Sequence, residues 1–242
     1  MSSRRAAEEM IRSGRVTVNG RTTTELGTRA NPWTDRIAVD GKPLRPSAPP
    51  VYLLLNKPVG VVTTLDDPQG RPTVRDLLKG MRARVFPVGR LDYHSAGLLL
   101  LTNDGELALR LTHPRYGIRK TYQVKVKGDP QPSQLATLAA GVRLADGTTN
   151  PADVHVLRQR DHKTWLSVTL AEGKNRQVRR MCEAVGLPVE KLVRVAFGAL
   201  KLGALAPGAW RHLEPGEVEQ LRRPAPPPRP ARPPRGRQRP HL

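Results

Sequence analysis

Short apolar runs, each bounded by a turn-forming residue, constrain the fold of this sequence most. The runs at 51–55, 60–64, 84–88 and 98–102 end near Gly, Pro, Asn or Asp. Runs of this length predict buried strands, because a helix needs about ten or more residues to bury one face. No run approaches the roughly eighteen apolar residues of a membrane span, so the sequence excludes such a span.

Beyond residue 102 the pattern predicts more strands than helices. Asn103 or Asp104 is placed to cap a helix, with Glu106 positioned to close a capping box. The other expected elements are strands at 120–127, 154–158 and 164–171, with a turn at 160–162, and glycine-terminated helices at 134–141 and 175–185. Local pairing therefore dominates over β-α-β crossovers. The predicted fold class for residues 51–221 is α+β, with a mixed, largely antiparallel sheet.

Residues 1–44 predict a separate small α+β module. Apolar residues recur at helical spacing over residues 3–13, with arginines beside them. Two short strands then lead into Asn19-Gly20 and Asp40-Gly41, dipeptides that tolerate positive φ and predict hairpin turns. The proline-containing segment 45–50 is expected to be a linker between this module and the larger domain.

The net charge of +20 at pH 7 predicts a polyanionic partner, because lysines and arginines that neutralise phosphates release condensed counterions. Residues 222–242 concentrate this charge, with seven arginines, eight prolines and no acid. Such a segment is expected to be disordered, as a loose phosphate-binding arm or as a solubilising extension. Aromatic residues make up only 4% of the chain, which argues against many base-stacking platforms.

The usual sequence motifs for cofactors and metals are absent. There is no Gly-rich phosphate loop ending in Lys-Ser/Thr, no HExxH, no CxxC and no G-x-S-x-G. The single cysteine, Cys182, can neither form an internal disulfide nor hold zinc by itself, and the six histidines are scattered. No apolar stretch follows the N-terminal arginines, so no secretory signal is expected. We expect a cytoplasmic protein whose reaction uses ordinary side chains, with no cofactor and no metal.

A polar loop flanked by glycines, residues 89–97, is the first candidate site. It lies between two predicted strands and carries Asp92, and a carboxylate on a loop held by rigid strands is a usual position for a catalytic acid. The alternative is that Asp92 only caps a turn. Tyr122 is the second candidate and shares its strand face with Val124 and Val126. It is either a core residue or an aromatic lid over a base.

The helix expected at 175–185 is the third candidate. Its polar stripe, beside an apolar face, holds Arg176, Arg179 and Arg180. Asn175 is expected to cap this helix, and the helix N-terminus then favours a phosphate together with the arginines. The alternative is an ordinary solvated face.

These candidate segments resemble the ordered motifs of rRNA pseudouridine synthases of the RsuA/RluB branch. The motifs are Gly89-Arg90-Leu91-Asp92 with 97–105, Lys120-Thr121-Tyr122, Glu172–Met181, and flanking strands at 54–61 and 192–198. The similarity covers residues 51–219. Residues 3–44 are similar to a small RNA-binding module shared with a ribosomal small-subunit protein. That resemblance implies that residue 1 falls at the module's second helix, so that its first helix is missing from the sequence.

The resemblance implies a pseudouridine synthase fold and an enzyme that isomerises uridine within RNA without a cofactor. Asp92 would be the essential carboxylate, which attacks the ribose or the base or removes a ribose proton. Arg179 would pair with Asp92, and Tyr122 would stack on the uracil. Leu192 would pack on the other side of the base. Arg90 would fill the space left by the extruded nucleotide.

The resemblance also implies contacts with RNA phosphates from basic residues in both parts of the chain. These residues are Arg4, Arg5, Lys57, Lys174, Arg176 and Arg180. The expected partner is ribosomal RNA or a pre-ribosomal particle, bound by a monomer away from membranes. A uridine of large-subunit 23S rRNA is the expected target, with small-subunit 16S rRNA as the alternative.

Two other function classes compete with this one. A non-catalytic RNA-binding or ribosome-assembly factor would explain the charge and the N-terminal module. A glycosidase-like hydrolase would need two carboxylates flanking one bond, and only one acid lies among the motifs. The enzyme hypothesis requires that folding bring Asp92, Tyr122 and Arg179 into one region.

Overall fold

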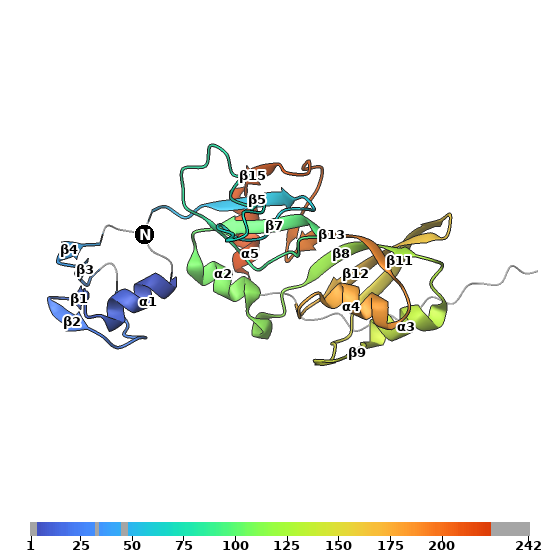
Figure 1. The fold of residues 1–242 in the computed structure, drawn as a ribbon, viewed down its shortest axis with the longest axis horizontal. Coiled ribbons are helices and arrows are strands. Elements are labelled where there is room, and N and C mark those ends of the chain that lie inside the picture. Colours follow the sequence, from blue (N-terminus) through green and yellow to red (C-terminus); the bar gives the residue numbers. More distant parts are fainter. Residues whose placement is uncertain (1–3, 32–33, 45–47, 224–242) are drawn as a thin grey trace, which may run out of the picture. The chain divides into compact units, whose positions relative to one another are not determined.

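A computed structural model describes residues 4–31, 34–44 and 48–223 of the chain. The chain divides into two compact units, residues 1–49 and 50–242 (Figure 1). The expected tail beyond residue 223 and residues 45–47 of the expected linker lie outside the described residues. Within the described ranges, no helix is long and apolar enough to cross a membrane.

The N-terminal unit is one helix followed by a small sheet. The helix, α1 (Arg4–Arg12), matches the amphipathic pattern. The strands are β1 (Val16–Val18), β2 (Arg21–Thr23), β3 (Ile37–Val39) and β4 (Lys42–Pro43), in the spatial order β2-β1-β3-β4. Asn19 at φ 52° and Asp40 at φ 50° form the β1–β2 and β3–β4 turns. Both predicted hairpins are therefore confirmed.

The C-terminal unit is built on one mixed sheet of nine strands. Its main path runs β11-β12-β8-β13-β7-β5-β15, while β14 pairs with β13 and β6 pairs with β7. Among the described strands of this sheet, only β13 and β7 pair in parallel, so the predicted largely antiparallel sheet is confirmed. The strands are β5 (Tyr52–Lys57), β6 (Phe86–Pro87), β7 (Ala96–Thr102), β8 (Lys120–Lys127), β11 (Asp153–Arg160), β12 (Lys163–Leu170), β13 (Val189–Phe197), β14 (Leu200–Lys201) and β15 (Trp210–His212). A separate hairpin joins β9 (Arg143–Leu144) and β10 (Gly147–Thr148).

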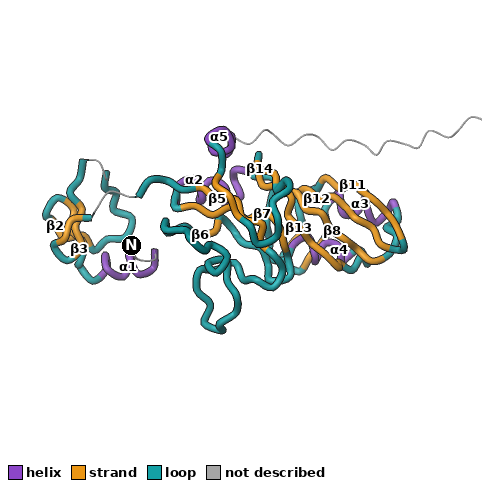
Figure 2. Tube along the Cα trace, turned by 90° about the horizontal axis from the view of Figure 1, so that it is seen from above, coloured by secondary structure: helices purple, strands orange, loops and turns teal. Residues whose placement is uncertain are grey.

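The β5–β7 pair is buried on both faces, which is why its sequence reads as continuous apolar runs. One face, including Leu54 and Leu98, packs against the helices α2 (Gly105–Thr112) and α5 (Pro215–Arg222). The other face, including Leu53 and Leu99, is covered by the long loop that connects β5 to β6, drawn in teal in Figure 2. Leu91, next to Asp92, packs in the same cluster, so this loop and the buried β5–β7 pair together hold the Asp92 segment in place.

The helices α3 (Pro132–Ala140) and α4 (Gln177–Ala184) cover one face of the sheet at β8, β12 and β13 (Figure 2). Met181 and Cys182 of α4 pack there with Val124 and Leu166. Burial raises the pKa of Cys182 to about 12, so this thiol is an inert core group. Helix α4 is thereby fixed against the strands that carry Tyr122 and Leu192.

The structure differs from the expectations at several element boundaries. The segment 60–64 is not a strand, although Val62 forms an isolated bridge with Thr73. Asp104 caps α2 by accepting from the Leu107 N–H at 3.0 Å, so no capping box closes through Glu106. A short 3₁₀ helix (Pro114–Tyr116) follows α2.

The helix α5 was not expected, and it changes the interpretation of residue 222. Arg222 ends α5 and donates to the Tyr52 hydroxyl at 2.7 Å and to the Asp104 carboxylate at 3.2 Å. The sequence pattern concealed this helix because its apolar residues are few, and Leu221 is the one buried residue of the helix. The compact fold therefore extends through the residue at which the tail was expected to begin.

Candidate active site

The loop that carries Asp92 runs from β6 to the start of β7 and is held at several points. The Thr63 hydroxyl donates to the Leu91 carbonyl at 2.6 Å, and the Ser95 N–H donates to the Asp92 carbonyl at 3.0 Å. The Asp92 carboxylate accepts no hydrogen bond and forms no ion pair within the described part of the chain. Turn capping therefore does not explain this side chain, and it remains available for chemistry.

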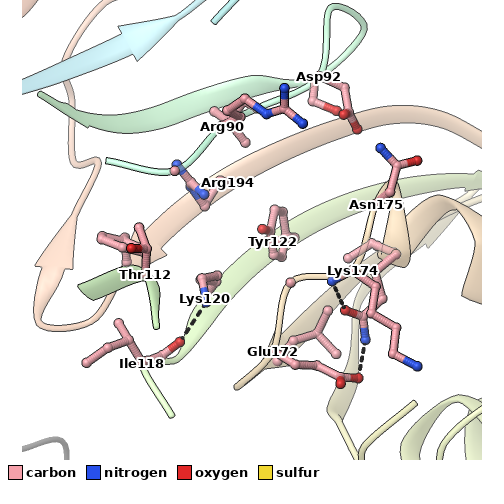
Figure 3. Close-up of a pocket in the computed structure, with 18 of the residues that line it drawn as sticks. Arg90, Asp92, Thr112, Ile118, Lys120, Tyr122, Glu172, Lys174, Asn175 and Arg194 are labelled. Carbon is pink, nitrogen blue, oxygen red and sulfur yellow. Dashed lines mark hydrogen bonds between the residues drawn. The ribbon is translucent and has the colours of Figure 1, made fainter. Parts of the chain in front are cut away.

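Asp92 and Tyr122 line the same cavity, together with Leu192 and Arg90 (Figure 3). Tyr122 comes from β8 and Leu192 from the adjacent β13. Arg90 is exposed at the rim and has no hydrogen-bond partner in the described ranges. The first two candidate segments, which are about thirty residues apart in the sequence, therefore meet in one cavity, as the enzyme hypothesis requires.

Arg179 lies on the inner side of α4, but its guanidinium does not form the expected ion pair with Asp92. Instead it donates to the His94 carbonyl at 2.7 Å and to the Val189 carbonyl at 3.3 Å. Burial lowers the pKa of Arg179, the Arg176 charge lowers it further, and the Asp92 carboxylate opposes both. Arg179 therefore influences Asp92 in two ways. Its charge attracts the Asp92 carboxylate, and its hydrogen bond holds the backbone carbonyl of His94, two residues further along the chain.

The two carbonyl contacts of Arg179 lead to a testable prediction. Arg179 reaches the two carbonyls with two different nitrogens, Nη1 for Val189 and Nη2 for His94. Because Arg179→Lys keeps the charge but replaces this planar fork with one nitrogen, we expect the Asp92 loop to shift. A shift of this kind lowers the single-turnover rate by roughly 10- to 100-fold. Arg180→Lys is the matched control, because Arg180 binds Asp146 on the outer side of α4. Equal rates for the two variants would contradict this role of Arg179.

Lys57 was expected to hold an RNA phosphate, and the structure corrects this prediction. Its side chain is 0% exposed, and its Nζ donates to the Val61 carbonyl at 2.8 Å and to the Pro58 carbonyl at 2.9 Å. Burial lowers the pKa of Lys57 to about 8, against a raising effect from the Asp92 charge. Lys57 therefore fastens the start of the β5–β6 loop and cannot reach RNA.

The buried Lys57 predicts a pH dependence of stability. Its pKa is about 8 in the folded chain and 10.5 in the unfolded chain, so between these values the unfolded state binds more protons. The free energy of unfolding should then rise with pH, by up to about 1.4 kcal/mol per pH unit. Lys57→Met removes this contribution, although it also leaves two carbonyls unpaired.

Urea unfolding of both proteins from about pH 7.5 to 9.5 checks this expectation. As the pH rises, the free energy of unfolding of the wild-type protein should increase relative to that of Lys57→Met. Titration of other groups, including Cys182, is present in both proteins and cancels in the difference. Parallel curves would show that Lys57 is not a buried titrating group.

The other expected phosphate ligands of this unit fall into two groups. The Lys174 Nζ donates to the carbonyls of the β9–β10 hairpin, and Arg180 binds Asp146 in the same hairpin. Both side chains therefore have intramolecular partners. Arg176 is exposed, has no hydrogen-bond partner in the described ranges, and lines the cavity. Of this group, Arg176 is best placed to bind a phosphate, and that role remains a prediction.

Two more of the expected RNA ligands lie in the N-terminal unit. Arg4 begins α1, and Arg5 is exposed on the same helix. Their helical position agrees with the predicted element, and contact with RNA remains a prediction.

Asn175 was expected to cap α4, and this expectation is wrong. The N-cap is Arg176, in a left-handed conformation at φ 47°. The Asn175 side chain instead points toward Asp92 at the cavity edge (Figure 3). Among the described residues, no group of three or more His, Cys, Asp or Glu side chains could hold a metal ion.

Two cationic residues of the cavity, Lys120 and Arg194, were missed at the sequence level. Period-two alternation places Lys120 on the same face as Tyr122, so the pattern could have found it. Arg194 lies directly across from Tyr122 in the β13–β8 pairing. Its position required the strand register, which the sequence alone did not give.

Comparison with known proteins identifies the family. Residues 51–184, more than half of the chain, match the family model described as RNA pseudouridylate synthase, and residues 1–32 match the S4 domain. The chain belongs to the RNA pseudouridylate synthase family. Asp92, Tyr122 and Arg179 lie inside the matched region. Membership confirms the prediction of an RNA-modifying enzyme over that of a non-catalytic RNA-binding factor.

Curated relatives are similar over nearly the whole chain. Ribosomal large subunit pseudouridine synthase B of Bacillus subtilis is 46% identical, over 92% of this chain and 91% of the relative. An RNA pseudouridine synthase of Aquifex aeolicus is 45% identical, over 91% of this chain and 89% of the relative. A solved pseudouridylate synthase matches with a TM-score of 0.68 and 31% identity, over 90% of this chain and 94% of that one. The pseudouridine synthase fold and the N-terminal S4 domain are thus both confirmed.

Proposed function

We propose that this pseudouridylate synthase converts a specific uridine of large-subunit 23S rRNA to pseudouridine, with Asp92 as its catalytic carboxylate. The observation that carries the role of Asp92 is its unpartnered carboxylate beside Tyr122 in one cavity. The choice of large-subunit rRNA is supported by relatives from Bacillus subtilis and Salmonella typhimurium, both of which are named ribosomal large subunit pseudouridine synthase B.

The reaction breaks the glycosidic C–N bond of uridine and joins the ribose to carbon 5 of the same uracil. Asp92 supplies the carboxylate that begins this exchange. The proton released from carbon 5 leaves through Tyr122, and the ring nitrogen freed by cleavage gains a proton, so that nothing is lost or oxidised. Tyr122 and Leu192 hold the uracil while it turns, because both project from neighbouring strands into the cavity.

The target atoms are inaccessible inside an RNA helix, so the nucleotide is extruded into the cavity. Extrusion costs a few kcal/mol, and least for a loop or a bulge. Arg90 is placed at the exposed rim beside Asp92, where its guanidinium occupies the vacated space. Arg176 holds a backbone phosphate and positions the RNA without reading its sequence.

We also propose that the enzyme acts as a monomer. Because its substrate is ribosomal RNA or a pre-ribosomal particle, we place it in the cytoplasm.

Mapping pseudouridines on both rRNAs from a strain that lacks this protein tests the assignment. One 23S position should lose the modification and regain it when the wild-type protein is restored. The purified protein should also modify that position in an unmodified 23S transcript. Loss at a 16S position would move the substrate to the small subunit, and no change in either rRNA would overturn the proposal.

A further inference from the structure

Two cations without a counter-ion lie in the same cavity as Asp92. Arg194 on β13 is 2% exposed, and the partly buried Lys120 is on the adjacent strand β8. Neither forms an ion pair with a carboxylate within the described part of the chain. Both approach the Phe197 ring, with the Arg194 Cζ at 5.1 Å and the Lys120 Nζ at 5.8 Å from its centroid.

The hydrogen-bond donors of these two residues are incompletely used. The Arg194 Nε donates to the Leu98 carbonyl at 2.8 Å, but its Nη2 is buried without any partner. Lys120 donates to the Ile118 carbonyl at 3.1 Å and has further hydrogens to give. A buried unpaired donor is costly and calls for an explanation. An anionic ligand that is absent from the isolated chain explains both residues.

No acid in the described ranges supplies that anion. Glu172 acts on Lys120 at long range, but its carboxylate accepts from the Asn150 N–H and the Gln177 side-chain amide. Burial, and then the charge of Arg194, lower the pKa of Lys120 to about 8. The two positive charges therefore repel each other, and an anion bound between them would stabilise both charged forms.

The position of the pair relative to Tyr122 indicates which anion fits. Lys120 precedes Tyr122 by two residues on β8, a rise of about 6.6 Å, and Arg194 pairs directly across from Tyr122. In Figure 3 the Arg194 guanidinium and the Lys120 side chain both lie along the cavity on one side of Tyr122. A group bound there is next to the uracil site but is not the uracil.

We propose that Arg194 and Lys120 form a phosphate subsite for the RNA backbone beside the target uridine. This inference rests on the proposed function, because it names how that substrate strand is held. The planar guanidinium and the ammonium together donate to the phosphate oxygens with charge-assisted hydrogen bonds. Fixing a phosphate at this depth holds the extruded nucleotide against Tyr122 and Asp92.

Kinetics on an unmodified 23S transcript test the subsite. Lys120→Met should raise KM about tenfold, a change of about 1.4 kcal/mol in binding of the strand, with a smaller fall in the rate at saturating RNA. It should also reduce the slope of log affinity against log salt by about one. Lys120→Arg is the matched control and should retain both values, because it keeps the charge. An unchanged KM and slope, or a loss confined to the rate at saturation, would overturn the subsite.

A second measurement does not depend on activity and uses inorganic phosphate as the probe. The lysines of the folded protein are labelled with ¹³C-methyl groups, and Lys120 is assigned by its absence in Lys120→Arg. Adding phosphate should raise the pKa of Lys120 by about one unit or more, and Arg194→Lys should weaken this response. No change on adding phosphate overturns the subsite, even if the enzyme is active. A clear change while neither rRNA is modified would instead overturn the proposed function alone.

Discussion

Asp92→Asn is expected to abolish pseudouridine formation while leaving RNA affinity nearly unchanged. The substitution keeps the size of the side chain and removes its charge and nucleophilic oxygen, which no neighbour replaces. The Asp92 carboxylate makes no hydrogen bond or ion pair within the described residues, and Asn keeps the backbone contact with Ser95, so the variant should fold normally. We expect the single-turnover rate on an unmodified 23S transcript to fall by roughly a thousandfold or more.

Asp66→Asn is the control for this experiment. Asp66 is an exposed acid of the β5–β6 loop, and it lines a second hollow that also reaches Asp92. Its replacement changes the net charge by the same amount near the same site, so general electrostatic effects on RNA binding are matched. Turnover retained by Asp92→Asn would falsify the assignment of the catalytic carboxylate, and equal loss in both variants would assign the effect to charge alone.

Much of the fold was predictable because its strands and turns are encoded locally. The leucine-rich β7 reads as a buried strand, and the Asn19 and Asp40 turns carry their signal in two residues. The helix α5 and the strand register were not predictable in this way. They depend on packing between segments that are far apart, such as Arg222 against Tyr52 and Asp104.

The residues of the candidate site also fall into a group that the sequence predicted and a group that depends on contacts between distant segments. The motif resemblance pointed to Asp92 and Tyr122, and folding brings both to one cavity. It could not show that Lys57 is buried or that Arg179 binds the His94 carbonyl, because both facts depend on which backbone oxygens lie nearby. The same limit concealed Arg194, whose unpaired donor becomes visible only when its surroundings are known. Charged residues are therefore the ones that sequence patterns assign least well here.

Among the glycines that the structure describes, Gly97 is expected to tolerate replacement by alanine least. Gly97 has φ +107°, and an added Cβ would lie 2.3 Å from the Arg194 carbonyl oxygen and 2.6 Å from the Arg194 nitrogen. The backbone conformation alone costs roughly 1–3 kcal/mol for a residue with a side chain. The clash adds to this cost, since the neighbour is backbone of a central strand and cannot move aside.

Gly97→Ala should also lower activity, because Gly97 lies where the strand that follows the Asp92 loop meets the strand of Arg194. It pairs with Arg194 in the β7–β13 ladder, the one parallel contact of the main sheet in the described residues. The Asp92 loop enters the sheet on the β7 side of this junction, whereas Tyr122 and Arg194 lie on the β13 side. Separating the two strands therefore moves the carboxylate away from the base-holding residues, and kcat/KM should fall even at temperatures where the variant is folded.

Gly105→Ala is the matched control for this prediction. Gly105 begins α2 and has no atom within 4 Å of an added Cβ, so the change should be neutral or stabilise by up to about 1 kcal/mol. Urea unfolding and single-turnover rates of both variants check the prediction. If Gly97→Ala matches Gly105→Ala in both, close approach at the β7–β13 junction is not what aligns Asp92 with Tyr122.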